Sequence, residues 1–291
     1  MIPFTYLEPA SLDEALALLS QHGEDAKLIA GGTGLVNLMK QRLVRPSVVI
    51  GLRGVKQLAG LAEADGLRIG ALATLASLET SPAVKRKAPL LAETIHHVAT
   101  VRVRTMATLG GAVAHADPFL DTPPALIALD AQIVARSARG ERKIPTNRFF
   151  TGFYQTVLAP DEMVTAILLP EQPKGSGSAF LKFLPATQDD YATISVAVRL
   201  ALDSKGTIVQ ARVALGAAAT VPVHATAVEA ALAGKTPDEK TFRDAASLVQ
   251  DAIDPIEDFR GSASYKRQMA AVHLRRALAE AAGRAQQVSR A

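Results

Sequence analysis

Two glycine-rich turns, at residues 30–34 (AGGTG) and 108–111 (TLGG), constrain this chain more than any other feature of its sequence. Glycine has no Cβ atom and tolerates positive φ, so both turns look suited to approach a phosphate and to aim successive N–H groups at it. Neither turn has the G-x-x-x-x-G-K-[ST] spacing of a P-loop or the G-x-G-x-x-G spacing of a Rossmann turn. We therefore expect a different dinucleotide-binding arrangement, in which two loops from separate subdomains close on one ligand.

The length and hydrophobic content of the chain indicate a folded protein of several units. With 291 residues, the chain can form two or three packed units, and a hydrophobic fraction of 48% argues against disorder. No run of about 18 apolar residues could span a membrane, and the N-terminus lacks a basic segment followed by an apolar one. We expect a cytoplasmic protein without a membrane span.

Charge and cysteine usage exclude further classes. The 32 basic and 28 acidic side chains are interleaved over most of the sequence, and only 4% of residues are aromatic. Nucleic-acid-binding proteins show a denser basic stripe with stacking aromatic residues, so no nucleic-acid partner is expected. Since the chain has no cysteine, it cannot ligate an iron–sulfur cluster or form a thiolate zinc site. Any such metal centre must lie in a partner.

The first unit is predicted to span residues 1–55. Residues 11–14 (SLDE) form a capping box, and apolar residues then recur at helical spacing until Gly23. Short apolar segments at residues 27–30 and 47–50 predict strands, the first of which leads into the first glycine turn. The pattern indicates a compact βαβ-like unit with its glycine turn at the carboxyl end of a strand.

The second unit is predicted to span residues 56–173 and contains the second glycine turn. Residues 88–100 are apolar enough for a helix, and Pro123 is suited to the first turn of another. The predicted strands of this unit are residues 67–70, 131–135, 142–144 and 163–169.

The third unit is predicted to span residues 178–291. It follows a segment at residues 171–178 that is rich in proline, glycine and serine and cannot supply a core. Strands grouped before helices indicate an α+β domain, with a three-stranded antiparallel sheet and helices packed on it. The expected strands are residues 179–183, 193–201 and 208–215, and the expected helices are residues 225–233, 236–252 and 264–282.

Four polar residues are candidates for cofactor contacts. Asp117 and Asp121 closely follow the second glycine turn, where a carboxylate could accept hydrogen bonds from ribose hydroxyls or a flavin ring, or could serve as a turn or cap residue. Tyr191 could pack on a flat cofactor or be a half-buried strand aromatic. Lys182 could contact a phosphate or adenine, or be an edge-strand lysine.

The sequence gives no support for a metal site or for a catalytic acid, base or nucleophile in this chain. His96, His97 and His115 lack the spacing of metal ligands. No Gly-x-Ser-x-Gly elbow is present.

Several motifs taken together resemble the medium, FAD-binding subunit of bacterial molybdenum hydroxylases, a family that includes carbon monoxide dehydrogenase and xanthine dehydrogenase. They are residues 30–34, 101–111 (VRVRTMATLGG), 115–118 (HADP) and 121–124 (DTPP), with 182–183 and 190–192 in the third unit. The likeness covers essentially the whole chain. It implies a two-subdomain FAD-binding fold of the vanillyl-alcohol-oxidase type, followed by an α+β C-terminal domain.

The resemblance also implies which residues contact FAD. The first loop would wrap the pyrophosphate and reach toward the flavin, a second wall would face it, Asp121 would bond a polar edge, and Tyr191 would lie beside the isoalloxazine. Lys182 would lie near the nucleotide, and Met163 and Val164 at the adenine end. The first loop comprises Leu28, Ile29, Ala30, Gly31, Gly32, Thr33, Gly34 and Leu35, and the second wall comprises Val98, Ala99, Thr108, Gly110, Gly111 and Ala112. The family often has Ser in place of Gly34.

By resemblance, this chain is an electron-transfer subunit. A large molybdenum-cofactor subunit would oxidise the substrate, a small subunit would relay electrons through two [2Fe–2S] clusters, and FAD in this chain would pass them to an external acceptor. The assembly would be a dimer of heterotrimers. Two alternatives stay open: a stand-alone FAD-dependent oxidase of the vanillyl-alcohol-oxidase type, and a binding module in which the glycine turns are only loops.

Overall fold

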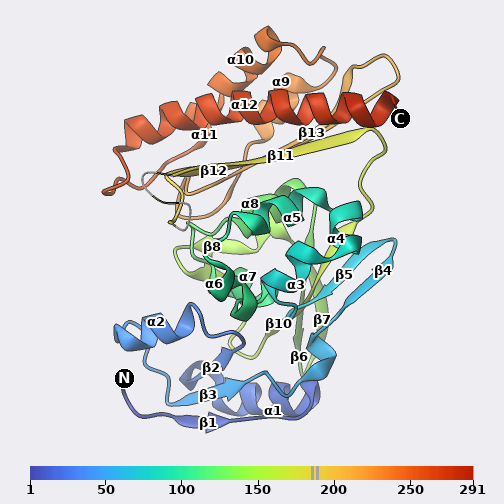
Figure 1. Cartoon of the computed structure of the whole chain (residues 1–291). Coiled ribbons are helices and arrows are strands. Elements are labelled where there is room, and N and C mark those ends of the chain that lie inside the picture. The colour runs from blue at the N-terminus through green and yellow to red at the C-terminus, as the bar shows by residue number, and fades with distance from the viewer. Residues whose placement is uncertain (185–186, 188–189, 291) are drawn as a thin grey trace.

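The computed structural model describes residues 1–184, 187 and 190–290, which form three units stacked along one direction (Figure 1). The N-terminal unit lies at one end, the second unit in the middle, and the C-terminal unit at the other end. The two glycine turns lie where the first and second units meet.

The N-terminal unit is a small parallel sheet with one covering helix. Its strands are β1 (Thr5–Leu7), β2 (Ala26–Ile29) and β3 (Val48–Gly51), in the order β1-β3-β2. Helix α1 (Leu12–His22) begins where the Ser11 hydroxyl accepts a hydrogen bond from Glu14 N, and ends at Gly23, whose φ is 52°. The helix start predicted at Ser11 and the βαβ-like arrangement are therefore confirmed, although the Glu14 carboxylate accepts from Ala10 N and not from Ser11 N. Helix α2 (Leu35–Lys40) follows the first glycine turn.

The middle unit holds a five-stranded antiparallel sheet and most of the short helices. The strands are β4 (Leu61–Ala64), β5 (Gly66–Gly70), β10 (Met163–Pro170), β6 (Gln132–Ser137) and β7 (Gly140–Pro145), in that order. The helices are α3 (Leu75–Thr80), α4 (Pro82–Lys87), α5 (Pro89–His96), α6 (Val101–Met106), α7 (Leu109–His115) and α8 (Thr122–Ala128). A two-stranded ribbon pairs β8 (Phe150–Gly152) with β9 (Gln155–Thr156). This unit also contains the single-turn 3-10 helices η2 (Lys56–Leu58) and η3 (Thr146–Arg148), whereas η1 (Gly23–Asp25) follows α1 in the N-terminal unit.

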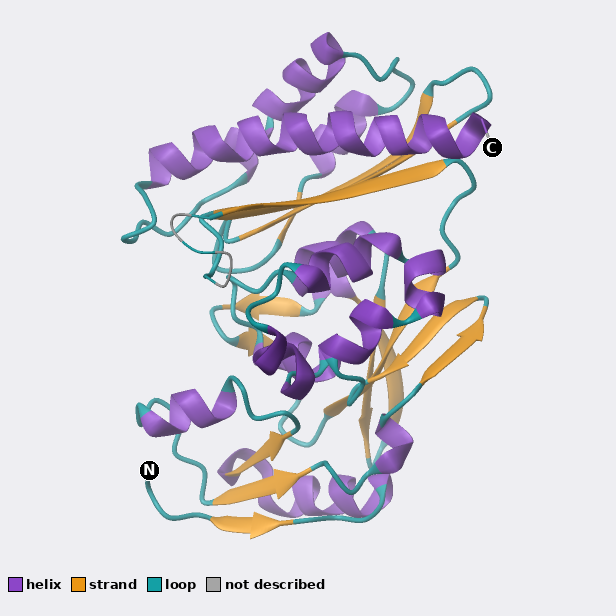
Figure 2. Ribbon diagram, viewed as in Figure 1, coloured by secondary structure: helices purple, strands orange, loops and turns teal. Residues whose placement is uncertain are grey.

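The C-terminal unit is an antiparallel sheet covered by helices. Its strands are β11 (Ser176–Phe183), β12 (Ile194–Leu202), β13 (Ile208–Gly216) and β14 (Val223–His224), paired in sequence order. The helices are α9 (Thr226–Leu232), α10 (Glu239–Ser247), α11 (Val249–Ala252) and α12 (Ala263–Arg290). Figure 2 shows α12 lying along one face of this sheet, and α5 and α8 of the middle unit contact the strands.

The C-terminal unit differs from the sequence prediction in several details. The sheet gains a fourth strand, β14, and β11 starts at Ser176, inside the segment predicted to be a domain boundary without a core. The helix expected over residues 236–252 is divided at Leu248 into α10 and α11. The cap of α10 is Asp238, whose carboxylate accepts from Thr241 N at 2.8 Å.

No helix among the described residues combines the length and apolar character needed to cross a membrane.

The C-terminal unit is fastened to the middle unit by both apolar and charged contacts. Phe180 of β11 is 1% exposed and belongs to the hydrophobic core of the middle unit. The buried guanidinium of Arg199 donates to Asp130 Oδ2 at 2.6 Å, and Arg284 of α12 donates to Glu93 Oε2 at 2.7 Å. These contacts fix where β11 lies relative to the middle unit.

We expect Phe180→Ala to lower the free energy of unfolding by about 3–5 kcal/mol, because a large side chain shared between two units would be replaced by a cavity. The measurement is urea unfolding followed by circular dichroism. Val209→Ala is the matched control in the same sheet, since Val209 is 57% exposed, and should cost less than about 1 kcal/mol. Equal effects of the two substitutions would contradict the role of Phe180.

Candidate cofactor site

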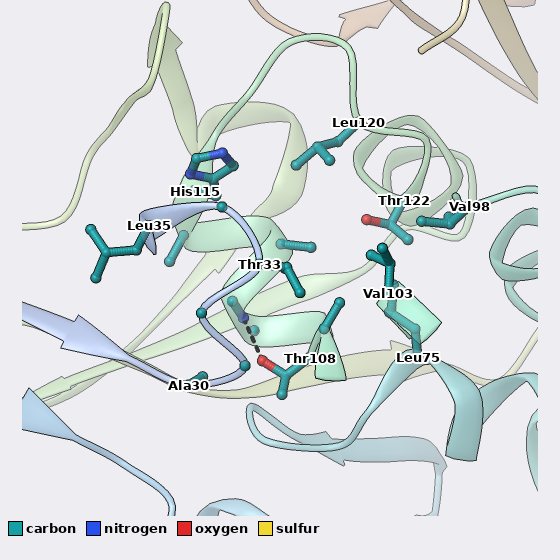
Figure 3. A pocket seen from close by; sticks show the side chains of 18 of the residues that line it. Ala30, Thr33, Leu35, Leu75, Val98, Val103, Thr108, His115, Leu120 and Thr122 are labelled. Atoms are coloured by element: carbon teal, nitrogen blue, oxygen red, sulfur yellow. Dashed lines mark hydrogen bonds between the residues drawn. The ribbon is translucent and has the colours of Figure 1, made fainter. Parts of the chain in front are cut away.

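A cavity of about 550 Å³ lies between the three units and is lined by both glycine turns (Figure 3). The N-terminal unit contributes the loop after β2, the middle unit contributes α7 and residues around α6, and the C-terminal unit contributes Lys182, Asp190 and Tyr191. Its volume falls in the range of sites that bury a small organic ligand or cofactor.

The first glycine turn offers a row of free backbone donors. Gly32 has a φ of 72°, a conformation that favours glycine. Within the described chain, no acceptor bonds the N–H groups of the five consecutive residues 31–35, whereas Val36 N donates to Gly32 O at 3.1 Å. Successive unpaired N–H groups on a turn form a concave anion site. The loop can therefore hold a phosphate or pyrophosphate.

The second glycine turn differs from the prediction, because its donors are already satisfied. Thr108 caps α7, and its hydroxyl accepts from Gly111 N at 3.1 Å, the dashed bond in Figure 3. Leu109 N and Gly110 N donate to the carbonyls of Ala73 and Ala71, both at 3.0 Å. This turn supplies a closely packed wall: a Cβ atom on Gly110 would overlap Ala71.

The two walls approach each other so closely that side chains are excluded at two points. A Cβ atom on Gly31 would overlap the carbonyl oxygen of Met106, a backbone atom that cannot turn away. A Cβ atom on Gly34 would lie 2.7 Å from Nε2 of His115, so the His115 side chain would have to move to admit it. Figure 3 shows His115 beside the first loop, close to Leu35.

The polar end of the cavity contains a buried ion pair with unused hydrogen-bonding capacity. Lys182 Nζ donates to Asp121 Oδ2 at 2.8 Å and to His97 O at 3.0 Å. Both side chains are at most 5% exposed. Burial raises the pKa of Asp121 to about 6, although the adjacent Lys182 opposes the shift. Among the residues that the structure describes, Asp121 Oδ1 and Thr122 Oγ1 are buried without a partner, which leaves their hydrogen-bonding capacity unused at this end of the cavity.

Aromatic rings form another part of the lining. The Tyr154 hydroxyl donates to Asp117 Oδ2 at 2.8 Å, and its ring meets the His115 ring at 5.1 Å between centroids. The residue Tyr191 is 43% exposed, and its ring lies 6.1 Å from that of Phe119 between centroids. Partial burial and the charge of Asp117 raise the pKa of Tyr191 to about 12, so its hydroxyl is protonated at neutral pH.

All of the predicted site residues line this cavity except Asp117 and Met163. Asp117 accepts hydrogen bonds from Phe119 N and from the Tyr154 hydroxyl, which places it behind the lining. Met163 is 1% exposed and packs in the hydrophobic core of the N-terminal unit, while its neighbour Val164 lines the cavity. The adjacent residues alternate sides because they lie on a strand.

Several residues that line the cavity were not predicted from the sequence as cofactor contacts. His115 lies inside a recognised motif, and only the fold shows that its ring reaches the first loop. Tyr154 comes from the ribbon of β8 and β9, which had no pattern to predict it. Further residues that line the cavity are Asn37, Leu38, Val44, Leu72, Leu75, Val103, Phe119 and Leu120.

Two family descriptions match almost the whole chain. Residues 2–172 match the FAD-binding domain in molybdopterin dehydrogenase, and residues 179–281 match the carbon monoxide dehydrogenase flavoprotein C-terminal domain. The chain belongs to this family of flavoproteins. The expected order of an FAD-binding domain followed by an α+β C-terminal domain, and FAD as the cofactor, are thereby confirmed.

Curated proteins and solved structures support the same assignment over the full length. The chain is 37% identical to the carbon monoxide dehydrogenase medium chain of Hydrogenophaga pseudoflava, covering 96% of this chain and 97% of that protein. It is 34% identical to the 6-hydroxypseudooxynicotine dehydrogenase complex subunit alpha of Paenarthrobacter nicotinovorans, covering 97% and 95%. A solved carbon monoxide dehydrogenase from Hydrogenophaga pseudoflava superposes with a TM-score of 0.94 at 39% identity, covering 98% of this chain and 99% of that one.

The cavity of this flavoprotein fits its cofactor. The free N–H groups of residues 31–35 suit a pyrophosphate, and the unpartnered oxygens of Asp121 and Thr122 suit polar edges of the cofactor. The aromatic and aliphatic side chains between them suit flat rings.

We expect Gly31→Ala to weaken FAD binding by at least about tenfold, because its methyl group would force the loop away from Met106 and displace the free N–H groups. Binding is measured by quenching of flavin fluorescence on titration into the cofactor-free chain. Gly283→Ala makes the same change in α12, where nothing lies within 4 Å of the added atom, and should leave binding unchanged. Equal affinity of the two variants would contradict the close approach of the walls.

Proposed function

We propose that this chain is the electron-transfer subunit of a molybdenum hydroxylase, taking electrons from [2Fe–2S] clusters in a partner and delivering them to an external acceptor. The observation that carries this proposal is a built FAD site in a chain that has no cysteine to hold a cluster. FAD, when bound, supplies the capacity to accept and donate one or two electrons.

The roles of the residues follow from their positions. The N–H groups of residues 31–35 hold the pyrophosphate, and the wall formed by α7 fixes the distance to the opposite loop. Asp121 and Lys182 hold a polar edge of the cofactor, and Tyr191 lies against the ring system. No residue in this scheme moves a proton to or from an organic substrate.

The proposed assembly contains two further kinds of subunit. The relatives are named as a medium chain and as a subunit of a complex, which supports a large molybdenum-cofactor subunit and a small [2Fe–2S] subunit as partners. We propose a dimer of such heterotrimers. A cytoplasmic location stays a prediction from the sequence.

The decisive experiment compares the purified FAD-loaded chain with the complete complex. We expect no substrate-dependent bleaching of flavin absorbance in the chain alone. The complete complex should show this bleaching, and metal analysis should find molybdenum and iron in it at stoichiometric amounts. A chemical reductant followed by a dye acceptor tests whether the flavin of the single chain exchanges electrons. Bleaching by an organic substrate in the metal-free chain would overturn the proposal in favour of a stand-alone oxidase.

The ionisation of Asp121 predicts a pH dependence of FAD binding. In the cofactor-free chain, burial raises the pKa of Asp121 to about 6. The folded chain therefore favours the protonated carboxyl group, and the contribution of this group to folding stability is present at low pH and lost as pH rises through 6. A hydrogen bond from an N–H group of the cofactor to the unpartnered Oδ1 of Asp121 favours the ionised carboxylate over the protonated carboxyl group. The FAD dissociation constant should therefore fall about tenfold from pH 5 to pH 7.

The variant Asp121→Asn serves as the control for that titration. Burial lowers the pKa of His97 and of His115 below the ordinary value of an imidazole, whereas it raises the pKa of Asp121. The asparagine variant should bind more weakly and show a flat profile by fluorescence titration. A wild-type pH profile in this variant would assign the titration to another group.

A further inference from the structure

A buried arginine stands behind the second wall of the cavity. Arg104, on α6, is 6% exposed. Its Nη1 donates to the carbonyl oxygens of Val98 and Ala99, both at 2.9 Å, and its Nε donates to Glu79 Oε2 at 2.8 Å. A guanidinium presents several donors in a fixed plane, so one side chain can satisfy a carboxylate and two carbonyls together.

The two carbonyls belong to a turn in an unfavourable conformation. Ala99 has a φ of 41°, which places its backbone in the left-handed region. Alanine has no polar side chain to compensate, so such a conformation persists only when neighbouring groups hold it. The hydrogen bonds from Arg104 reach the carbonyl of Ala99 and that of the residue before it, which is where this support is needed.

The same turn carries contacts on which the cofactor site depends. Val98 and Ala99 line the cavity directly. The carbonyl of the preceding His97 accepts from Lys182 Nζ, and Lys182 in turn pairs with Asp121. A shift of this turn would therefore change the shape of the wall and release one of the two anchors of the lysine.

We propose that Arg104 is a positioning residue for FAD: it holds the turn at residues 97–99 in its left-handed conformation, and thereby places the second wall and the Lys182–Asp121 pair. Glu79 holds the guanidinium of Arg104 in place by accepting a hydrogen bond from its Nε. The Oε1 atom of Glu79 also accepts from His96 Nδ1 at 2.8 Å. Arg104 itself does not line the cavity. The inference rests on the assignment of FAD to this site.

The test is a double-mutant cycle between Arg104→Lys and Ala99→Gly. Lysine keeps the positive charge beside Glu79, but its single ammonium group cannot reproduce the planar fork that reaches both carbonyls. In the presence of Ala99, Arg104→Lys should raise the FAD dissociation constant about tenfold. In the Ala99→Gly background, the same substitution should raise it only about twofold, because glycine needs no support at this φ.

A matched control comes from the same helix. Arg102 is exposed, and among the described residues its guanidinium has no hydrogen bond or ion pair. Arg102→Lys should leave FAD binding unchanged. Each variant is titrated with FAD by fluorescence quenching, its flavin environment is compared by visible circular dichroism, and the unfolding of the cofactor-free chain is followed separately.

The outcomes separate the competing explanations. Equal FAD affinity for Arg104→Lys and Arg102→Lys would overturn the proposal. A tenfold loss of the same size in both backgrounds would also overturn it, because Arg104 would then act only through general stability. Loss of visible circular dichroism in Arg104→Lys and its recovery on adding Ala99→Gly supports positioning. If wild type itself fails to bind FAD, the cofactor assignment fails instead.

Discussion

The contact of Gly31 with the Met106 carbonyl sets the distance between the two halves of the flavin site. Because no side-chain atom fits between them, the loop after β2 lies directly on the backbone between α6 and α7. The N–H groups of residues 31–35 have no acceptor among the described residues. The same loop therefore combines a close fit to the facing wall with free donors for the cofactor.

The C-terminal unit supplies two things that the two walls lack: the charge of Lys182, and the ring of Tyr191, which we call the aromatic cover. Lys182 reaches from β11 into the polar end of the cavity. Tyr191 is held by a neighbouring cluster: Arg260 bonds Asp190 at 3.0 Å and lies 5.6 Å from the Tyr191 ring and 5.8 Å from Phe119. The aromatic cover is therefore anchored to the segment that precedes α12, far away in sequence.

The sequence predicted those parts of the fold whose signals are local. The capping box at residues 11–14, the strand before the first glycine turn and the long strands of the C-terminal sheet all follow from periodicity and turn residues. The short helices α3, α4 and α6 were missed because six residues give fewer than two turns of pattern. Strand β4 (LAEA) lacks the β-branched residues that mark a strand.

The limits of prediction at the site have the same physical origin. Glycine spacing indicated two loops that meet, but not that Thr108 and the carbonyls of Ala71 and Ala73 would consume the donors of the second loop. The resemblance placed Met163 at the cofactor, whereas the alternation of β10 turns it into the core of the N-terminal unit. Arg104 carried no sequence signal of its role, because the positive φ of Ala99 is visible only in three dimensions.

The position of Lys182 has a consequence for how relatives can recombine. The two family domains of this chain abut near residue 175 in sequence, yet a single ion pair inside the cofactor site takes its carboxylate from one and its ammonium from the other. A chimera joined at that boundary inherits half of this pair from each parent. An exchanged C-terminal domain must therefore bring a lysine that reaches both Asp121 and the His97 carbonyl of the other domain, and an aromatic residue at the position of Tyr191.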